Sequence, residues 1–306
     1  MDFLGFIIIL IKVLVIFAAT LLTVLIMTLA ERRVSAFMQG RLGPNRVGPQ
    51  GLLQPIADGI KFLMKEDIIP AGVDKPIFIL APAILLIPAL MTFAVIPFGS
   101  DITLFGRKIP LQVADVNVGI LYVLALTSIG VYGIVLAGWS SNSKYSLLGG
   151  LRSSAQLISY ELAMGLAVVS IILLSGSLKL NDIVADQQGH FLSWNIFKQP
   201  LAFIIFLVAV YAETNRLPFD LSEAEQELVG GYHTEYSSMK FAMFFMAEYA
   251  NMITAAALTV TLFFGGWDVP FLNETSLGLW GALLSVTSFI LKMGFFLFLF
   301  IWVRWT

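Results

Sequence analysis

The chain has 306 residues, 58% of them hydrophobic and only 12% charged, with a formal net charge of −2 and a mean hydropathy of +0.88. A soluble chain carries about a quarter charged residues, so this composition excludes a soluble globular protein and predicts a multi-pass helical membrane protein. The sequence has no cysteine, which excludes disulfides, iron–sulfur ligation and thiolate zinc sites within this chain. Its two histidines, His190 and His233, lie in polar connections, so a haem held between membrane histidines is also excluded. Any redox centre must therefore belong to a partner.

Seven apolar stretches are candidate membrane spans. They cover residues 3–30, 76–98, 117–139, 154–175, 200–216, 239–263 and 280–303. The first is longer than a bilayer needs, so we expect it to be tilted rather than to be a cleaved signal peptide. The second contains Pro82 and Pro88, and we expect it to be kinked. No soluble domain interrupts these spans, so residues 1–306 are predicted to form a single all-α membrane domain.

Basic residues are unevenly divided between the two sides of these spans. Four lie on one side: Arg107, Lys108, Lys179 and Lys198. Twelve lie on the other: Arg32, Arg33, Arg41, Arg46, Lys61, Lys65, Lys75, Lys144, Arg152, Arg216, Lys240 and Arg304. The positive-inside rule predicts that the twelve face the inside and that the N-terminus lies outside. Two further lysines fall within spans: Lys12 can reach outward, whereas Lys292 needs a partner that the sequence does not name.

The first inner connection covers residues 31–75. Glycine and proline recur in its first part, and we expect a shaped loop there and not a helix. From Pro55 to Glu66, apolar residues repeat at helical spacing with charged residues on the other side: Ile56, Ile60, Leu63 and Met64 against Asp58, Lys61 and Lys65. This pattern predicts a short amphipathic helix at the membrane interface. The helix either only anchors the loop or also lines, with the end of the first span, an opening for a lipid-like substrate.

Three carboxylates fall within the predicted spans. Glu161 and Glu248 lie seven and nine residues into spans that start inside, and Glu213 lies about thirteen residues into one that starts outside. At about 1.5 Å per residue, all three are roughly 10–14 Å from the inner boundary. Acids at one depth on neighbouring spans indicate a proton relay or an ion path, with Tyr160 and Tyr249 as nearby hydroxyls. The alternative is three acids that each have a partner and serve packing.

The polar run at residues 213–228 is preceded by an apolar run of only twelve residues, 201–212. Twelve residues cover about 18 Å of a core about 30 Å thick, so a spanning helix must continue into the polar run and place Glu213 inside the bilayer. Otherwise a short helix ends at the surface. Asp220, followed by Leu-Ser-Glu223, fits a capping box and predicts the start of a short helix. The clustered acids can hold shared protons or can form a solvated loop: Asp220, Glu223, Glu225 and Glu227.

These segments carry a family resemblance along the chain. The runs are AERR (30–33), RLGPNRVGP (41–49), GLLQPIAD (51–58), KED (65–67), LGGLRSSAQLISYE (148–161), ETNRLPFDLSEAEQEL (213–228), and EYS and AEYAN within 235–251. With them the sequence resembles the quinone-site membrane subunit of respiratory complex I, NADH:quinone oxidoreductase, which is known in bacteria as the H subunit. The family usually continues through a basic stretch into an eighth span. This sequence ends at Thr306, after the seventh predicted span, so either the last helix is absent or the sequence is truncated.

The resemblance implies that the inner segments 31–75 and 213–240 form the quinone site and a docking region for the hydrophilic arm. Arg32, Phe37, Asp58 and Arg216 match residues that the family uses around the quinone tunnel. The family's acidic path near the quinone is matched by Glu213, Glu223, Glu225 and Glu227, with Asp220 beside them. Its buried path toward the antiporter-like subunits is matched by Glu161, Glu213 and Glu248.

The same resemblance implies ubiquinone or menaquinone as substrate, with no metal or flavin bound by this chain. The implied partners are the other complex I subunits and membrane lipid, without nucleic acid. The implied location is a bacterial inner membrane or, alternatively, the mitochondrial inner membrane. Two other functions stay open: the homologous membrane subunit of an energy-converting hydrogenase or ferredoxin-linked complex, and a free-standing ion transporter. The complete 31–66 and 213–228 runs favour the quinone enzyme, and the absence of repeated halves disfavours a transporter.

Overall fold

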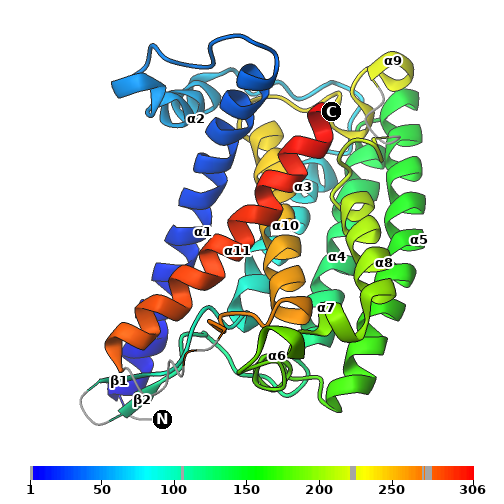
Figure 1. Cartoon of the computed structure of the whole chain (residues 1–306). Coiled ribbons are helices and arrows are strands. Elements are labelled where there is room, and N and C mark those ends of the chain that lie inside the picture. Colours follow the sequence, from blue (N-terminus) through cyan, green and yellow to red (C-terminus); the bar gives the residue numbers. More distant parts are fainter. Residues whose placement is uncertain (1–2, 105–106, 221–224, 271, 273–277) are drawn as a thin grey trace.

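The computed structural model describes residues 3–104, 107–220, 225–270, 272 and 278–306. The described part is a helical bundle with one short hairpin (Figure 1). Its α-helices are α1 Phe3–Met38, α2 Gln54–Met64, α3 Lys75–Met91, α4 Gly119–Ser140, α5 Lys144–Ser175, α6 Leu180–Ala185, α7 Asn195–Lys198, α8 Pro200–Glu213, α9 Glu225–Leu228, α10 Ser238–Phe263 and α11 Leu279–Trp305. Short 3₁₀ turns are η1 Pro49–Gly51, η2 Thr92–Val95, η3 Phe191–Ser193 and η4 Gly231–His233, and strands β1 Ile102–Leu104 and β2 Arg107–Ile109 pair antiparallel.

Six helices of the described residues are long and apolar enough to cross a membrane, namely α1, α3, α4, α5, α10 and α11. The prediction of an all-α multi-pass membrane protein is confirmed, although the β1–β2 hairpin was not predicted. The chain continues in hydrogen-bonded helix through Pro82 and Pro88 of α3, and the expected kink stays a prediction.

The fifth predicted span, 200–216, is wrong at its end. Helix α8 ends at Glu213, and its 14 residues cover about 21 Å, less than the hydrocarbon core. The helix stops because Asn215 adopts a left-handed φ of 49° and Pro218 disfavours helical backbone at the residue before it. Glu213 is therefore the last residue of a short helix and does not lie within a longer one.

Helix α1 corrects the loop predicted from residue 31. Residues 31–38 contain neither glycine nor proline and continue the helix of the first span to Met38. The helix ends where Gly40 adopts a φ of 66°, which glycine tolerates without steric cost. The side chains of Glu31 and Arg32 are consequently held on a rigid element.

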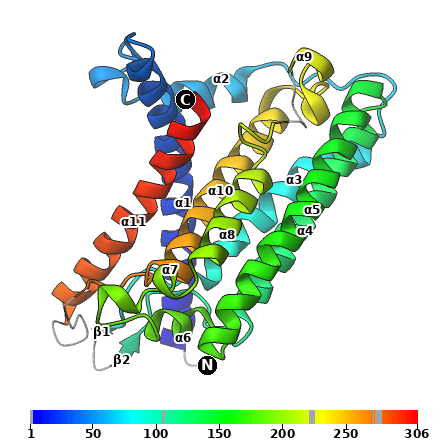
Figure 2. The same cartoon turned by 45° about the vertical axis from the view of Figure 1, so that its right-hand side comes forward.

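The bundle is built around α10 (Figures 1 and 2). In the most apolar window of α10, 67% of the residues are buried, against 11% for α1, which stands at the edge of the bundle. Helices α2 and α9 lie at one end of the molecule with the C-terminus, while the N-terminus, β1–β2, α6 and α7 lie at the other. This arrangement agrees with the two sides that the distribution of basic residues predicts.

Small residues let neighbouring segments approach closely. A Cβ atom at Gly133 of α4 would lie 2.9 Å from the backbone nitrogen of Leu85 in α3. A Cβ atom at Gly149 of α5 would lie 2.7 Å from the Cα of Gly231, in the turn η4. Side chains at these positions would force the backbones apart, so glycine sets these helix contacts.

The two lysines within spans both have partners. The Lys292 ammonium donates hydrogen bonds to the carbonyls of Phe264, Gly266 and Asp268 at 2.9, 3.0 and 2.7 Å. It also lies 4.5 Å from the centre of the Trp194 ring. Lys12 donates to the Gln112 carbonyl at 3.1 Å. The turn that follows α10 thus supplies the partner of Lys292 that the sequence left unnamed.

Candidate functional site

A cavity of about 310 Å³ lies between α1, α2 and α10, and we call it the α1–α2 cavity. Apolar side chains form most of its wall, among them Val24, Leu25, Phe62, Phe241, Phe245 and Met246. Arg32 of α1 and Asp58 of α2 also line it and form an ion pair at 2.6 Å. Gln54, one helical turn before Asp58, donates to the same carboxylate at 3.1 Å.

The amphipathic helix predicted at 55–66 is present as α2, and it presents two different faces. Pro55, Asp58, Gly59 and Phe62 face the α1–α2 cavity. The apolar residues that predicted the helix are exposed on the protein surface: Ile56, Ile60, Leu63 and Met64. Such a face suits the membrane interface, so α2 can both anchor the loop and line the cavity. Phe37, predicted near the same opening, is 85% exposed and does not line the cavity.

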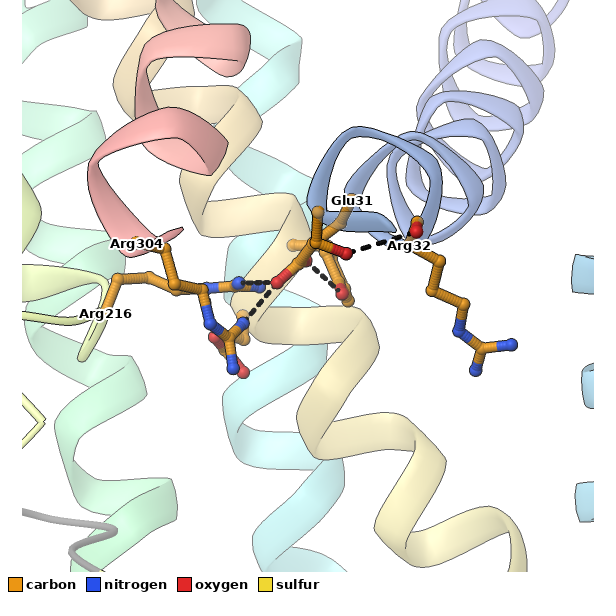
Figure 3. Close-up of polar contacts among 7 residues, drawn as sticks. Glu31, Arg32, Arg216 and Arg304 are labelled. Atoms are coloured by element: carbon orange, nitrogen blue, oxygen red, sulfur yellow. Dashed lines mark hydrogen bonds and ion pairs between the residues drawn. The ribbon is translucent and has the colours of Figure 1, made fainter. Parts of the chain in front are cut away.

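A second group of residues surrounds Glu31 on α1, and we call it the Glu31 cluster (Figure 3). The Glu31 carboxylate is 6% exposed and accepts a hydrogen bond from Arg216 at 2.8 Å and another from Arg304. The Tyr249 hydroxyl donates to its other oxygen at 2.6 Å. Arg32, the next residue of α1, points away from this cluster in Figure 3.

Arg216 joins Glu31 to Glu248 of α10. Its Nε lies 2.5 Å from a Glu248 oxygen, and its guanidinium lies 4.8 Å from the centre of the Tyr249 ring. Only 4% of the Arg216 side chain is exposed. The structure thus brings this predicted quinone-site residue into an ion-pair cluster and not onto the wall of the α1–α2 cavity. Two guanidinium groups and two carboxylates balance their charges within the cluster, which reduces the cost of burying them.

The three predicted membrane carboxylates share a small cavity of about 40 Å³, which we call the carboxylate cavity. Glu161, Glu213 and Glu248 all line it, together with Asn215 and Asn251. A water molecule needs roughly 10–15 Å³ of such space, so the carboxylate cavity has room for a few waters with polar partners. The structure therefore brings together, at one place, the three acids that the span register put at one depth.

Hydroxyls reach two of these carboxylates. Ser128 of α4 donates to Glu161, and Thr127 hydrogen-bonds with Glu213. Glu161 and Glu213 also lie close enough to repel each other electrostatically when both are ionised.

The two cavities are connected through adjacent residues of α10. Tyr249 lines the α1–α2 cavity and bonds to Glu31, while Glu248 lines the carboxylate cavity and pairs with Arg216. Successive residues of a helix point about 100° apart, so one turn of α10 can face both sites. The result is a series of polar contacts from the α1–α2 cavity through the Glu31 cluster to the carboxylate cavity.

The acidic run after α8 is only partly described. Glu223 lies outside the described residues, as does the side chain of Glu225, so the capping box predicted at Asp220 lies there too. Asp220 itself is partly buried. Glu227 at the end of α9 is exposed and pairs with Arg152 of α5 at 2.6 Å. Glu227 therefore does not join the buried carboxylates.

Sequence reasoning missed three residues that hold this site together. The sequence pattern marks Glu31 only as part of a motif, and Arg304 only as a basic residue on the inner side. Gln156 of α5 donates to the carbonyls of Ala212 and Phe219 at 2.9 and 2.8 Å, and so fixes the turn that carries Arg216. The position of Glu31 could have indicated its role. It directly follows a long apolar run, and the helix of that run has no stop signal until Gly40, so the acid had to lie on the same helix.

Burial perturbs two groups in the connection beside the site. It lowers the pKa of His233 to about 4 and raises the pKa of Tyr236 to about 12. Both groups are therefore neutral near pH 7. Among the described residues, no group of three or more acids or histidines has an arrangement that could hold a metal ion.

Comparison with known proteins gives similarities along nearly the whole chain. The sequence profile of a family described as NADH dehydrogenase matches residues 11–306. A Geobacter sulfurreducens protein, named as an H-type subunit of NADH-quinone oxidoreductase, is 58% identical over 96% of this chain and 84% of its own length. A Geobacter metallireducens protein with the same kind of name is 59% identical, over 96% and 85%. The H-type subunit of the Leptospira biflexa NADH-quinone oxidoreductase is 54% identical, over 97% and 85%.

Proposed function

Because this chain belongs to the NADH dehydrogenase family, as an H-type membrane subunit, we propose that it frames the quinone site of an NADH-quinone oxidoreductase and couples quinone reduction to proton translocation. The observation that carries the proposal is the series of polar contacts from the α1–α2 cavity to the carboxylate cavity. A quinone is the substrate of this site, and its electrons come from redox centres on other subunits of the complex.

The α1–α2 cavity suits a substrate with a long apolar tail. Its phenylalanine, valine and methionine side chains bury an isoprenoid chain, which gains free energy by leaving water. The Arg32–Asp58 ion pair places a polar edge on this wall. On this proposal Arg32 and Asp58 orient the polar head of the quinone as it passes, while the apolar wall retains the tail.

Proton movement is the task of the carboxylates. Reduction of a quinone by two electrons creates negative charge that must be neutralised by two protons. Negative charge arriving in the α1–α2 cavity raises the proton affinity of the acids that face it. Tyr249 is the hydroxyl between this cavity and Glu31, and Arg216 transmits a change at Glu31 to Glu248 because it binds both. The carboxylate cavity then supplies or accepts protons through Glu213 and Glu161.

The proposal extends to the partners and the membrane. The exposed inner connections would dock the hydrophilic-arm subunits, and exposed apolar helix faces would contact lipid and the other membrane subunits. The location we propose is a bacterial inner membrane with the N-terminus outside, from the twelve-to-four division of basic residues. The names of the relatives favour the quinone enzyme over an energy-converting hydrogenase.

Replacing Glu213 with glutamine tests the coupling. The substitution keeps the size of the side chain and removes its ability to ionise, so proton translocation should fall at least about ten-fold and quinone turnover should slow. Electron flow from NADH to an artificial acceptor upstream of the quinone should not change. All three rates are measured in membranes that carry the assembled complex. Asp115→Asn is the control, because Asp115 is a partly exposed acid in the connection before α4, paired with Lys179 at 2.8 Å.

Two outcomes would assign Glu213 a role other than coupling. Normal pumping per quinone reduced, with normal turnover, would make Glu213 a structural acid and would contradict the coupling part of the proposal. Loss of upstream electron flow in Glu213→Gln would instead indicate a defect in assembly.

A further inference from the structure

A slot lies between α1 and α11, in the half of α1 nearest the N-terminus. One face of α1, from Ile11 through Val15 and Ala19 to Thr23, forms one wall. Residues of α11, among them Ile290, stand opposite. The slot has a volume of about 340 Å³ and shares no lining residue with the α1–α2 cavity or the carboxylate cavity. It is therefore separate from the site already described, and we call it the Lys12 slot.

The length of the Lys12 slot matches an acyl chain. The α1 wall covers thirteen residues from Ile11 to Thr23, a rise of about 18 Å, which is close to the roughly 15 Å depth of one leaflet core. A single extended hydrocarbon chain occupies such a slot along its full length.

The hydroxyl and amide groups inside the slot do not need water as a hydrogen-bond partner. Thr20 and Thr23 donate to carbonyls of their own helix at 2.8 Å. The Gln112 amide donates to the Val95 carbonyl and accepts from Asn181 at 2.7 Å. The hydroxyl and amide groups of the wall are thus satisfied within the protein, and the remaining surface is apolar. An apolar chain fills such a space favourably.

Lys12 gives the slot one charged end. Among the described residues that line it, Lys12 is the only charged one. Lys12 lies nine residues after Phe3, where the predicted span begins, and its long side chain can reach outward to the lipid head groups of this leaflet. Its ammonium donates a hydrogen bond to the Gln112 carbonyl. Asp101 is the acid in electrostatic reach, and it is exposed to solvent.

We propose that the Lys12 slot binds one acyl chain of an anionic phospholipid from this leaflet, with the lipid phosphate against the Lys12 ammonium. A comparison within the same molecule supports the role of charge. A neighbouring cavity of about 350 Å³, which shares Ile16, Thr20 and Phe93 with the slot, is lined otherwise by apolar and hydroxyl residues and by no described charged residue. That cavity offers nothing that distinguishes one head group from another.

Photo-crosslinking in nanodiscs tests the assignment. The assembled complex is reconstituted with phosphatidylglycerol or phosphatidylcholine that carries a diazirine on one acyl chain, and labelled peptides are identified by mass spectrometry. Phosphatidylglycerol should label α1 and α11 residues of the slot about five-fold more than phosphatidylcholine, the size expected for one partly exposed ion pair. Lys12→Gln should remove this preference, and Lys12→Arg should keep it.

A pair of neighbouring substitutions distinguishes a slot from ordinary lipid contact. Ala19→Phe fills the slot and should abolish labelling of α11 residues, whereas Ala18→Phe, which lines neither cavity, should leave it unchanged. Equal labelling by both lipids in the unmodified protein would overturn the proposal. So would undiminished labelling in Ala19→Phe, or the absence of labelled α1 and α11 slot residues with either lipid.

Discussion

The buried guanidinium of Arg216 offers the sharpest test of how the Glu31 cluster is held together. In Arg216→Met, Glu31 keeps the contacts of Arg304 and Tyr249, but Glu248 loses the cation that lies 2.5 Å from it. A buried ion pair broken on one side costs about 3–5 kcal/mol, because an uncompensated charge is left behind. For a protein of 306 residues that corresponds to a fall in melting temperature of roughly 5–8 °C.

The measurement is the melting temperature of the purified complex in nanodiscs, read from the amount of this chain that stays soluble after heating. Arg152→Met is the control, because the Arg152–Glu227 pair is exposed and its loss should cost about 1 kcal/mol or less. Adding Glu248→Met to Arg216→Met removes the orphaned charge and should recover most of the lost stability. An Arg216→Met protein as stable as Arg152→Met, or a double variant no better than the single one, would refute the reasoning.

Tyr249, His233 and Gly149 offer three further tests. Tyr249→Phe removes the hydroxyl that donates to Glu31, which should lower the free energy of unfolding by about 1.5–3 kcal/mol. It should also slow quinone turnover more than it changes the KM for quinone. An unchanged turnover would exclude Tyr249 from the proton path. Burial lowers the pKa of His233 to about 4, so the unfolded chain binds more protons between about pH 4 and 6.5. The contribution of His233 to the free energy of unfolding should therefore rise with pH in that window, by up to about 3 kcal/mol, and His233→Phe should reduce the matching rise in melting temperature. Gly149→Ala should destabilise by about 1–3 kcal/mol because its new methyl group meets the backbone of the η4 turn, whereas Gly165→Ala in the same helix, with open space around it, should not; equal melting temperatures for the two would contradict the packing of α5.

The spans could be predicted because hydropathy is a local property of the sequence. The depth argument also brought Glu161, Glu213 and Glu248 to the same cavity, since helix rise fixes depth once the start of a span is known. The end of α8 was misplaced because a minimum spanning length was imposed on it. Asn215 and Pro218 instead stop the helix at Glu213, so the end of a helix here is set by backbone preference.

The Glu31 cluster could not be predicted because its partners are distant in the chain. Arg216 lies 185 residues from Glu31, and Arg304 lies 273 residues away. No periodic pattern links such positions; only the packing of α1 and α11 beside α10 brings them together. Phe37 shows the reverse case, since its motif pointed to the quinone opening while the structure leaves its ring exposed beyond the α1–α2 cavity.

The anchoring of Lys292 limits how α11 can move. Its ammonium binds three carbonyls of the turn after α10, twelve residues before Arg304 on the same helix. A slip of α11 by a full turn, about 5.4 Å along its axis, would draw Lys292 away from those three carbonyls. A piston movement of that size therefore costs these bonds before it takes Arg304 from Glu31. Arg304 can instead separate from Glu31 by rotation of the Arg304 side chain, or by a tilt of α11 about the point where Lys292 is held.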